Sequence, residues 1–245
     1  MSLLEIKDVR KSFGGLLAVN NFSMKLETGD IVAVIGPNGA GKTTLFNLIT
    51  HHIAPDSGHV IFRGEEITHL KPDKICLTGV GRSFQIAAIF PTLTVLQTMQ
   101  LGLISHYKKN WQLFFPAINM FREEALEVLN NVGMAKQLHV IAEKLPHGDK
   151  KRLDVALALA TKADLLLLDE PAAGLSPTDR IYMMELLESL VEKQGLTLLF
   201  IEHDLDIVMS TAHRICVMHQ GTLIAEGRPD EIRHNREVQR IYMGN

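Results

Sequence analysis

The residues GPNGAGKTT, Gly36 to Thr44, have the types and the spacing of a loop that binds phosphate groups. They fit the pattern G-x-x-x-x-G-K-[ST], whose glycines let consecutive backbone N–H groups point at phosphate oxygens. In such a loop Lys42 reaches the β- and γ-phosphates, and the Thr43 hydroxyl coordinates Mg²⁺. A chance match is expected in about one chain in a hundred of this length, but here the loop follows an apolar run and opens a helix, as phosphate binding requires. The sequence therefore predicts a nucleotide site formed by Gly36, Pro37, Asn38, Gly39, Ala40, Gly41, Lys42, Thr43 and Thr44.

A second chemically active group is the acidic pair that ends the apolar run in LLLLDEP. Ligand sites of α/β proteins lie at the carboxyl ends of strands, which is where this pair falls. Asp169 is predicted to support the Mg²⁺ shell, and Glu170 to orient or deprotonate an attacking water. The alternative is an ordinary acidic exit from a strand. The phosphate loop upstream in the same chain favours the catalytic interpretation.

The elements that must position these residues begin as short strands. Turn residues separate three runs, LLEIKDV, LLAVNNFSMKL and IVAVIG, within the first 36 residues. The run IVAVI is continuously apolar and rich in β-branched residues, so it predicts a strand buried on both faces.

From about Thr94 to Ala160 the apolar residues recur three and four apart, which predicts helices in TVLQTMQLGLI, EEALEVLNNVGM and DKKRLDVALALA. After this helical lobe, the strands DLLLLDEP, LTLLFIEHD and RICVMHQG alternate with helices over 179–193 and 206–212. Such alternation predicts a parallel sheet with helices on both faces. We expect one domain, 1–245, with a core in 1–93 and 161–245 and an inserted helical subdomain over about 94–160.

Composition limits the classes of function. The net charge is −3, so no basic surface argues for nucleic acid. Cys76 and Cys216 have no metal-like spacing and predict buried thiols in a reducing compartment. The N-terminus carries charges where a signal peptide needs an apolar stretch, and no run approaches the roughly 18 apolar residues of a membrane span. We expect a cytoplasmic protein that does not itself cross a bilayer.

Together these motifs resemble the ATP-binding subunits of ABC transporters over nearly the whole chain. The resemblance implies an α/β P-loop ATPase with a mostly parallel core sheet, an N-terminal antiparallel β subdomain and an inserted helical subdomain. It implies that Gln85 in GRSFQ senses Mg²⁺ and the membrane partner, that His203 in FIEHD contacts the γ-phosphate, and that Phe13 in KSFGG stacks on adenine. Taken singly, each of these residues could also be an ordinary solvated, surface or core side chain. Their order along the chain favours the functional interpretation.

The same resemblance gives a role to LPHGD, the residues Leu145, Pro146, His147, Gly148 and Asp149. The family signature commonly reads Leu-Ser-Gly-Gly-Gln and caps the γ-phosphate of the nucleotide held by the opposite subunit. Here Pro146 replaces the serine, so the hydroxyl and one backbone donor are absent. Gly148 and the helix N-terminus remain to face the phosphate, while the charge of Asp149 should weaken its attraction. We hypothesise a heterodimer with a paralogous subunit, in which the two ATP sites turn over unequally.

Four segments, FGGLLAVNNFSM, DEPAAGLSP, IEHDLDIVM and REVQRIYMGN, resemble the ATP-binding subunits of branched-chain amino-acid importers. This resemblance implies ATP and Mg²⁺ as cofactors and a peripheral location at the cytoplasmic face of the inner membrane. The implied partners are integral membrane permease subunits, a second ATP-binding subunit and, indirectly, an external solute-binding protein, with no nucleic acid. The resemblance implies uptake of a small polar solute, but the substrate stays open, because the membrane subunits and the binding protein select it. Urea, short amides and other small polar solutes are alternatives to branched-chain amino acids.

Two other functions fit these residues less well. A soluble ATP switch acting on DNA or ribosomes would need a long coiled-coil insertion or two fused heads, and the chain has neither. A P-loop phosphotransferase would leave Gln85, LPHGD and His203 unexplained.

Two further groups have open interpretations. The aromatic residues Trp111, Phe114, Phe115 and Phe121 either pack the helical lobe or receive a helix of the membrane subunits. His51 and His52 have no evident third ligand, so a solvated helix end is expected rather than a metal site.

Overall fold

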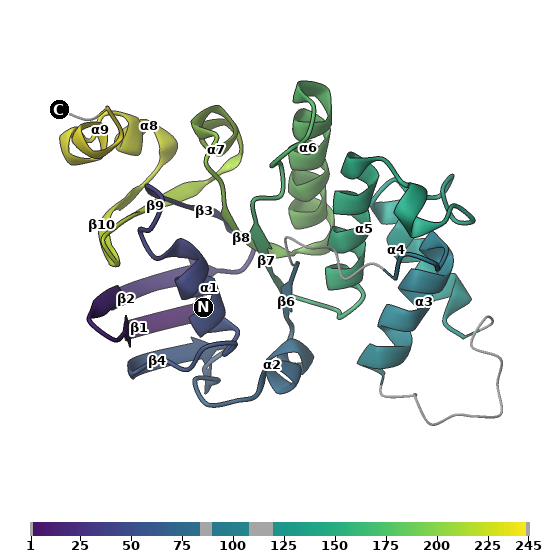
Figure 1. Cartoon of the computed structure of the whole chain (residues 1–245), viewed down its shortest axis with the longest axis horizontal. Helices are drawn as coiled ribbons and strands as arrows, with labels where there is room; N and C mark the ends of the chain where they lie inside the picture. The colour runs from purple at the N-terminus through teal and green to yellow at the C-terminus, as the bar shows by residue number, and fades with distance from the viewer. Residues whose placement is uncertain (1, 84–89, 108–119, 244–245) are drawn as a thin grey trace.

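The structure is a computed structural model that describes residues 2–83, 90–107 and 120–243 (Figure 1). Gln85, Trp111, Phe114 and Phe115 lie outside the described residues. Within the described residues, no helix is long and apolar enough to cross a membrane.

The N-terminal strands form an antiparallel sheet, at the lower left in Figure 1. Within the described residues it has four strands in the order β2-β1-β4-β5. Their bounds are Ser2–Phe13 (β1), Leu16–Glu27 (β2), Ser57–Phe62 (β4) and Glu65–Glu66 (β5). β1 is longer than the predicted run LLEIKDV, because it continues to the two-residue turn at Gly14 and Gly15, where φ of Gly14 is +57°. β2 begins where LLAVNNFSMKL begins and adds only Glu27 at its end.

A larger sheet carries the strands that lead to the predicted site. Within the described part of the chain its order is β10-β9-β3-β8-β7-β6, with β9, β3, β8, β7 and β6 parallel and β10 antiparallel to β9. The bounds are Ile31–Ile35 (β3), Val80–Arg82 (β6), Leu165–Asp169 (β7), Thr197–Ile201 (β8), Arg214–His219 (β9) and Thr222–Gly227 (β10). Every residue of β3, β7 and β8 is buried, which confirms the predicted two-sided burial of IVAVI.

The helices lie around this sheet. Their bounds are Lys42–Ile49 (α1), Pro72–Thr78 (α2), Val95–His106 (α3), Arg122–Asn131 (α4), His147–Leu159 (α5), Pro177–Gln194 (α6), Leu205–Thr211 (α7), Pro229–Arg233 (α8) and Arg236–Met243 (α9), with a 3-10 turn at Ala142–Lys144 (η2). α3, α4 and α5 lie together at the right in Figure 1, as the helical periodicity predicts.

β3 shows how the two sides of the larger sheet are filled. Ile31, Ala33 and Ile35 belong to a core shared with α3, α5 and α6, whereas Val32 and Val34 belong to a core shared with α1 and the antiparallel sheet. Alternate residues of a strand point to opposite faces, so one short apolar strand joins both cores. Its carboxyl end is held rigidly where the phosphate loop begins.

Candidate nucleotide site

The predicted phosphate loop connects β3 to α1. Gly41 precedes α1 with φ +102°, and a Cβ atom there would lie 2.2 Å from the Ala18 carbonyl oxygen. Gly36 leaves β3 with φ +154°, and its Cβ would lie 2.1 Å from the Met218 carbonyl oxygen. Since no side chain fits either position, both glycines of the motif are required by backbone and space together.

Lys42 points back into this loop. Its ammonium donates hydrogen bonds to the Gly36 and Pro37 carbonyl oxygens, at 2.7 and 3.0 Å, and the residue is 6% exposed. Burial lowers the pKa of Lys42, while attraction to Glu170 and Asp169 opposes that change. The loop lysine and the acidic pair, far apart in sequence, are therefore close enough to interact.

Asp169 ends β7 and is buried. Burial raises the pKa of its carboxyl, and attraction to Arg82 and a hydrogen bond from Thr43 act in the opposite direction. Its Oδ1 atom is buried without a hydrogen-bond partner among the described residues. A buried, unpaired carboxylate oxygen beside the Thr43 hydroxyl is a donor set that suits a hard divalent cation, so the residues fit Mg²⁺.

Glu170 has a left-handed backbone, with φ +53°. Its N–H donates to the Ile201 carbonyl oxygen at 2.9 Å, and its own carbonyl oxygen accepts from Lys151 Nζ at 2.8 Å. Its carboxylate lies 3.1 Å from His203 Nε2. The predicted base and the predicted phosphate-contacting histidine are thus neighbours at the ends of β7 and β8.

Glu202 is a site residue that the sequence reasoning missed. It is 4% exposed, and its two carboxylate oxygens accept hydrogen bonds from the backbone N–H groups of Ala172 and His203, at 2.7 and 3.2 Å. Burial raises the pKa of Glu202, and these two hydrogen bonds oppose the rise. It therefore ties the loop after Glu170 to His203. The available signal was an acidic residue at the end of an apolar strand, directly before the predicted histidine.

Phe13 lies at the end of β1 and is 45% exposed, with Lys11 Nζ 5.7 Å from its ring centroid. An exposed aromatic face is compatible with the stacking role expected for it. Phe121, in contrast, stacks on Tyr107 with ring centroids 4.8 Å apart and packs against the core. For this one member of the aromatic segment the contacts favour lobe packing.

The predicted signature residues lie at the start of α5. Leu145 is buried, Pro146 is the N-cap, and Pro146 and His147 are exposed. Within the described residues, no hydrogen bond or ion pair joins residues 145–149 to the phosphate loop. The action of these residues on a nucleotide held by a second subunit stays a prediction.

The structure changes the expectation for Asp149. Its carboxylate is largely buried and forms an ion pair with Arg152, three residues later on α5. Arg152 also lies over the Tyr182 ring, with its guanidinium carbon 5.0 Å from the centroid. The negative charge expected to weaken phosphate attraction is thus compensated within the helix.

The two cysteines are free thiols, with Cys216 buried and Cys76 half-buried. Burial raises the pKa of both thiols, which agrees with the expected low reactivity, although Cys76 is less buried than predicted. His51 and His52 make local hydrogen bonds, to the Leu70 carbonyl and the Thr50 hydroxyl respectively.

Asp154, on α5, gives a testable dependence of stability on pH. It is 8% exposed, and burial raises the pKa of its carboxyl to about 7, with attraction to Lys151 opposing the rise. An unfolded aspartate has a pKa of about 3.9, so Asp154 binds its proton more tightly in the folded chain than in the unfolded chain. The free energy of unfolding therefore falls as the pH rises from about 4 to about 7. Asp154→Asn is expected to raise the free energy of unfolding by about 2–4 kcal/mol at pH 8 and to change it little at pH 4.

Urea denaturation at the two pH values measures this difference. Asp73→Asn, at an exposed position on α2, is the control and should change stability by less than about 0.5 kcal/mol at either pH. An equal gain from Asp154→Asn at both pH values would show that its ionisation does not cost stability.

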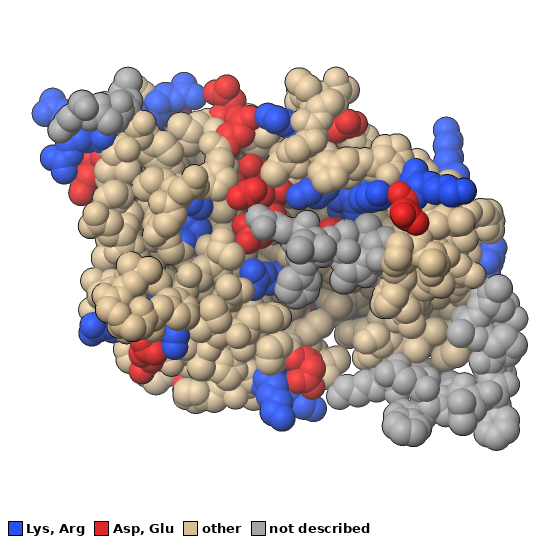
Figure 2. Space-filling model, in the orientation of Figure 1, with Lys and Arg blue, Asp and Glu red and all other residues tan. Residues whose placement is uncertain are grey.

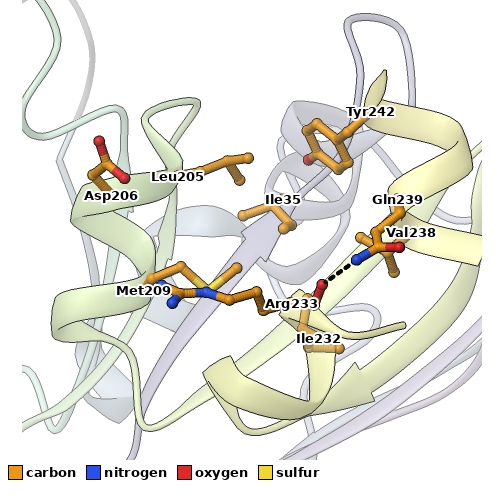
Figure 3. A pocket seen from close by; sticks show the side chains of 9 residues that line it. All are labelled: Ile35, Leu205, Asp206, Met209, Ile232, Arg233, Val238, Gln239 and Tyr242. Carbon is orange, nitrogen blue, oxygen red and sulfur yellow. Dashed lines mark hydrogen bonds between the residues drawn. The ribbon is translucent and has the colours of Figure 1, made fainter. Parts of the chain in front are cut away.

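Behind the phosphate loop, a cavity of about 360 Å³ lies between the end of β3 and the helices α7, α8 and α9 (Figure 3). Figure 3 shows Ile35, Leu205, Met209 and Tyr242 around it. Burial raises the pKa of Tyr242 to about 12, opposed by a backbone hydrogen bond from Gly36. None of the predicted nucleotide contacts lines this cavity. The C-terminal helix therefore supports the loop from behind.

Charges on the face shown in Figure 2 are mixed. Among the described residues there, basic and acidic side chains are interspersed, and acidic ones gather near the centre of the view.

Comparisons with known proteins agree with this geometry. Residues 19–173 match the family model described as "ABC transporter", and residues 222–245 match one described as "Branched-chain amino acid ATP-binding cassette transporter". The high-affinity branched-chain amino acid transport ATP-binding protein LivG of Salmonella typhimurium is 39% identical, over 99% of this chain and 98% of that protein.

Solved structures show the same fold. The ADP conformation of an ATP-binding cassette of an ABC transporter is similar with a TM-score of 0.89 and 31% identity, over 100% of both chains. A dimeric post-hydrolysis cassette bound to ADP and Pi is similar with a TM-score of 0.77 and 25% identity, over 92% of this chain and 98% of that one. The chain therefore belongs to the ABC transporter family, as a nucleotide-binding, ATP-hydrolysing subunit.

Proposed function

We propose that this chain is the ATPase subunit of an importer for branched-chain amino acids. The observation that carries the proposal is the convergence of Lys42, Asp169, Glu170 and His203 at the carboxyl ends of β3, β7 and β8. The match of residues 222–245 to a model for branched-chain amino acid transporters supports the substrate class.

The roles proposed for these residues follow from their chemistry. The backbone N–H groups of residues 36–44 and the Lys42 ammonium bind the β- and γ-phosphates of ATP. Mg²⁺, held by the Thr43 hydroxyl and Asp169, with Gln85 assigned by resemblance alone, would neutralise phosphate charge. The oxygen of the attacking water bonds to the γ-phosphorus while Glu170 accepts a proton from that water. The bond from the γ-phosphorus to the β–γ bridging oxygen breaks at the same time. His203 contacts the γ-phosphate and orients the Glu170 carboxylate. Phe13 stacks on the adenine.

Leu145, Pro146, His147, Gly148 and Asp149 complete the site of a second ATP-binding subunit. Dimeric cassettes among the structural relatives support such pairing. Because Pro146 offers neither a hydroxyl nor an N–H, the site completed by this chain binds phosphate with fewer donors. We therefore propose a paralogous partner and unequal turnover of the two sites. The helical subdomain over residues of about 94–160 carries the signature residues, and they move with it.

The remaining partners are two integral membrane subunits and, through them, an external solute-binding protein. The chain is expected to lie peripherally on the cytoplasmic face of the membrane. Closure of the two ATP-binding subunits drives the membrane subunits, and hydrolysis resets them.

Affinity purification from gently solubilised membranes tests this assembly. With a tag on the N-terminus, we expect recovery of two polytopic membrane proteins and a second, similar ATPase. The tagged Glu170→Gln chain should recover the same set, because assembly does not require turnover, and an untagged strain is the control for background. Recovery of the chain alone, or with ribosomes, would contradict the transport assignment and favour a soluble ATP switch.

A further inference from the structure

Lys151 reaches from α5 to the backbone of Glu170. Its ammonium donates to the Glu170 carbonyl oxygen at 2.8 Å in a partly buried position, nineteen residues away in sequence. A hydrogen bond from a charged group is stronger than one between neutral groups when it is shielded from water. A lysine pays rotamer entropy to be held in this way, so the contact persists only where its surroundings favour it.

The surroundings of the Lys151 ammonium are acidic. Asp154 lies nearly one helical turn further along α5, and the carboxylates of both Asp154 and Glu202 are attracted to Lys151. Both of these carboxyl groups are buried, at 8% and 4% exposure. The hydrogen bond fixes the ammonium at the Glu170 carbonyl, and either carboxylate, when ionised, adds attraction to it.

The peptide that Lys151 holds is in an unfavourable conformation. A residue other than glycine with φ +53° is strained and is kept only by fixed surroundings. The Glu170 N–H is fixed by the Ile201 carbonyl on β8. The Glu170 carbonyl oxygen accepts from Lys151 on α5 at 2.8 Å and, at 3.2 Å, from the Ala173 N–H of the loop that follows. The direction of the Glu170 side chain depends on this peptide, since the Cβ vector turns with φ and ψ.

α5 is also the helix that carries the signature residues at its start. Lys151 lies one turn beyond His147, on the same rigid helix. A displacement of α5 would therefore move the Lys151 ammonium relative to the Glu170 carbonyl oxygen.

We propose that Lys151 is a positioning residue that fixes the Glu170 peptide from the signature helix and so sets the carboxylate for attack on ATP. The proposal rests on the proposed role of Glu170 as the base. Lys151 itself touches neither nucleotide nor water in this account.

A double-mutant cycle tests the proposal with the full-length chain and Mg-ATP. Lys151→Met keeps the length of the side chain but removes the donor, and it is expected to lower kcat about tenfold to a hundredfold, as a small misplacement of a catalytic group does. The Kd for ATP should change by less than about twofold, because the phosphate loop is untouched. Lys151→Arg should restore most of kcat, since arginine can donate to the same carbonyl.

The decisive arm combines Lys151→Met with Glu170→Gln, measured by single-turnover hydrolysis of labelled ATP. If Lys151 acts through Glu170, the double variant should be no slower than Glu170→Gln alone. Lys136→Met, at an exposed position in the same lobe, is the control for loss of a charge and should leave kcat unchanged. Multiplied losses in the double variant, or a fall in ATP affinity that follows a fall in Tm, would overturn the proposal. Full turnover by Glu170→Gln would instead reject the proposed base and leave the Lys151 contact a structural one.

Discussion

Glu170→Gln is expected to lower ATP turnover about 10²–10³-fold while changing the Kd for ATP by less than about twofold. Glutamine keeps the size of the side chain and can still meet His203, which lies 3.1 Å from the carboxylate, but it cannot accept the proton of the attacking water. The contacts of Glu170 with the Ile201 carbonyl and the Lys151 ammonium use only backbone atoms of Glu170, so the substitution leaves them intact. The loss should therefore appear in kcat alone.

Phosphate release measures turnover, and fluorescence of a labelled ATP measures binding. Glu185→Gln, at an exposed position on α6, is the matched control and should retain full activity. If Glu170→Gln turned over normally, another group would have to activate the water.

The second large effect is expected from Lys42→Ala, which should weaken ATP binding at least about a hundredfold. A charged hydrogen bond to phosphate and the attraction of an ammonium to several phosphate charges are lost together. The effect should be on binding rather than on folding. The ammonium is buried at a cost in solvation, which its lowered pKa reflects. Among the described residues its hydrogen bonds go to the Gly36 and Pro37 carbonyl oxygens of its own loop.

Equilibrium binding of labelled ATP and the Tm of the same samples distinguish a loss of ATP binding from a loss of folding. We expect lost binding with a Tm within a few degrees of wild type, and no change in either quantity for Lys193→Ala, an exposed lysine at the end of α6. Retained ATP affinity in Lys42→Ala would contradict the role assigned to the phosphate loop.

The sequence predicts structure best where the residues that bind or react directly follow a strand with a clear apolar pattern. IVAVI predicts a buried strand because every residue is apolar, and the glycine pattern after it places the phosphate loop, so β3, Gly36 and Lys42 follow from local information. LLLLD predicts the buried strand β7 in the same way, because four apolar residues precede the aspartate. The family resemblance then supplies the fold around these segments.

The rest depends on contacts between distant segments. Lys151 and Glu202 meet the residues around Glu170 only after α5, β7 and β8 have packed, and no local periodicity specifies that meeting. Asp149 is an intermediate case, since its pairing with Arg152 is an i, i+3 contact that helical spacing could have predicted. The roles of Phe13, Gln85 and the signature remain predictions from resemblance.

The most direct test of the account is substrate uptake by the assembled complex. The complex purified through this chain, reconstituted in proteoliposomes with Mg-ATP on the side of the ATP-binding subunits and the solute-binding protein on the other, should transport labelled leucine. The same complex carrying Glu170→Gln should assemble and bind ATP but transport at least about tenfold more slowly, because closure would no longer be reset by hydrolysis in this chain's site. Leucine uptake at the wild-type rate by the Glu170→Gln complex, or none by the wild-type complex, would contradict the proposal that ATP hydrolysis in this chain powers import.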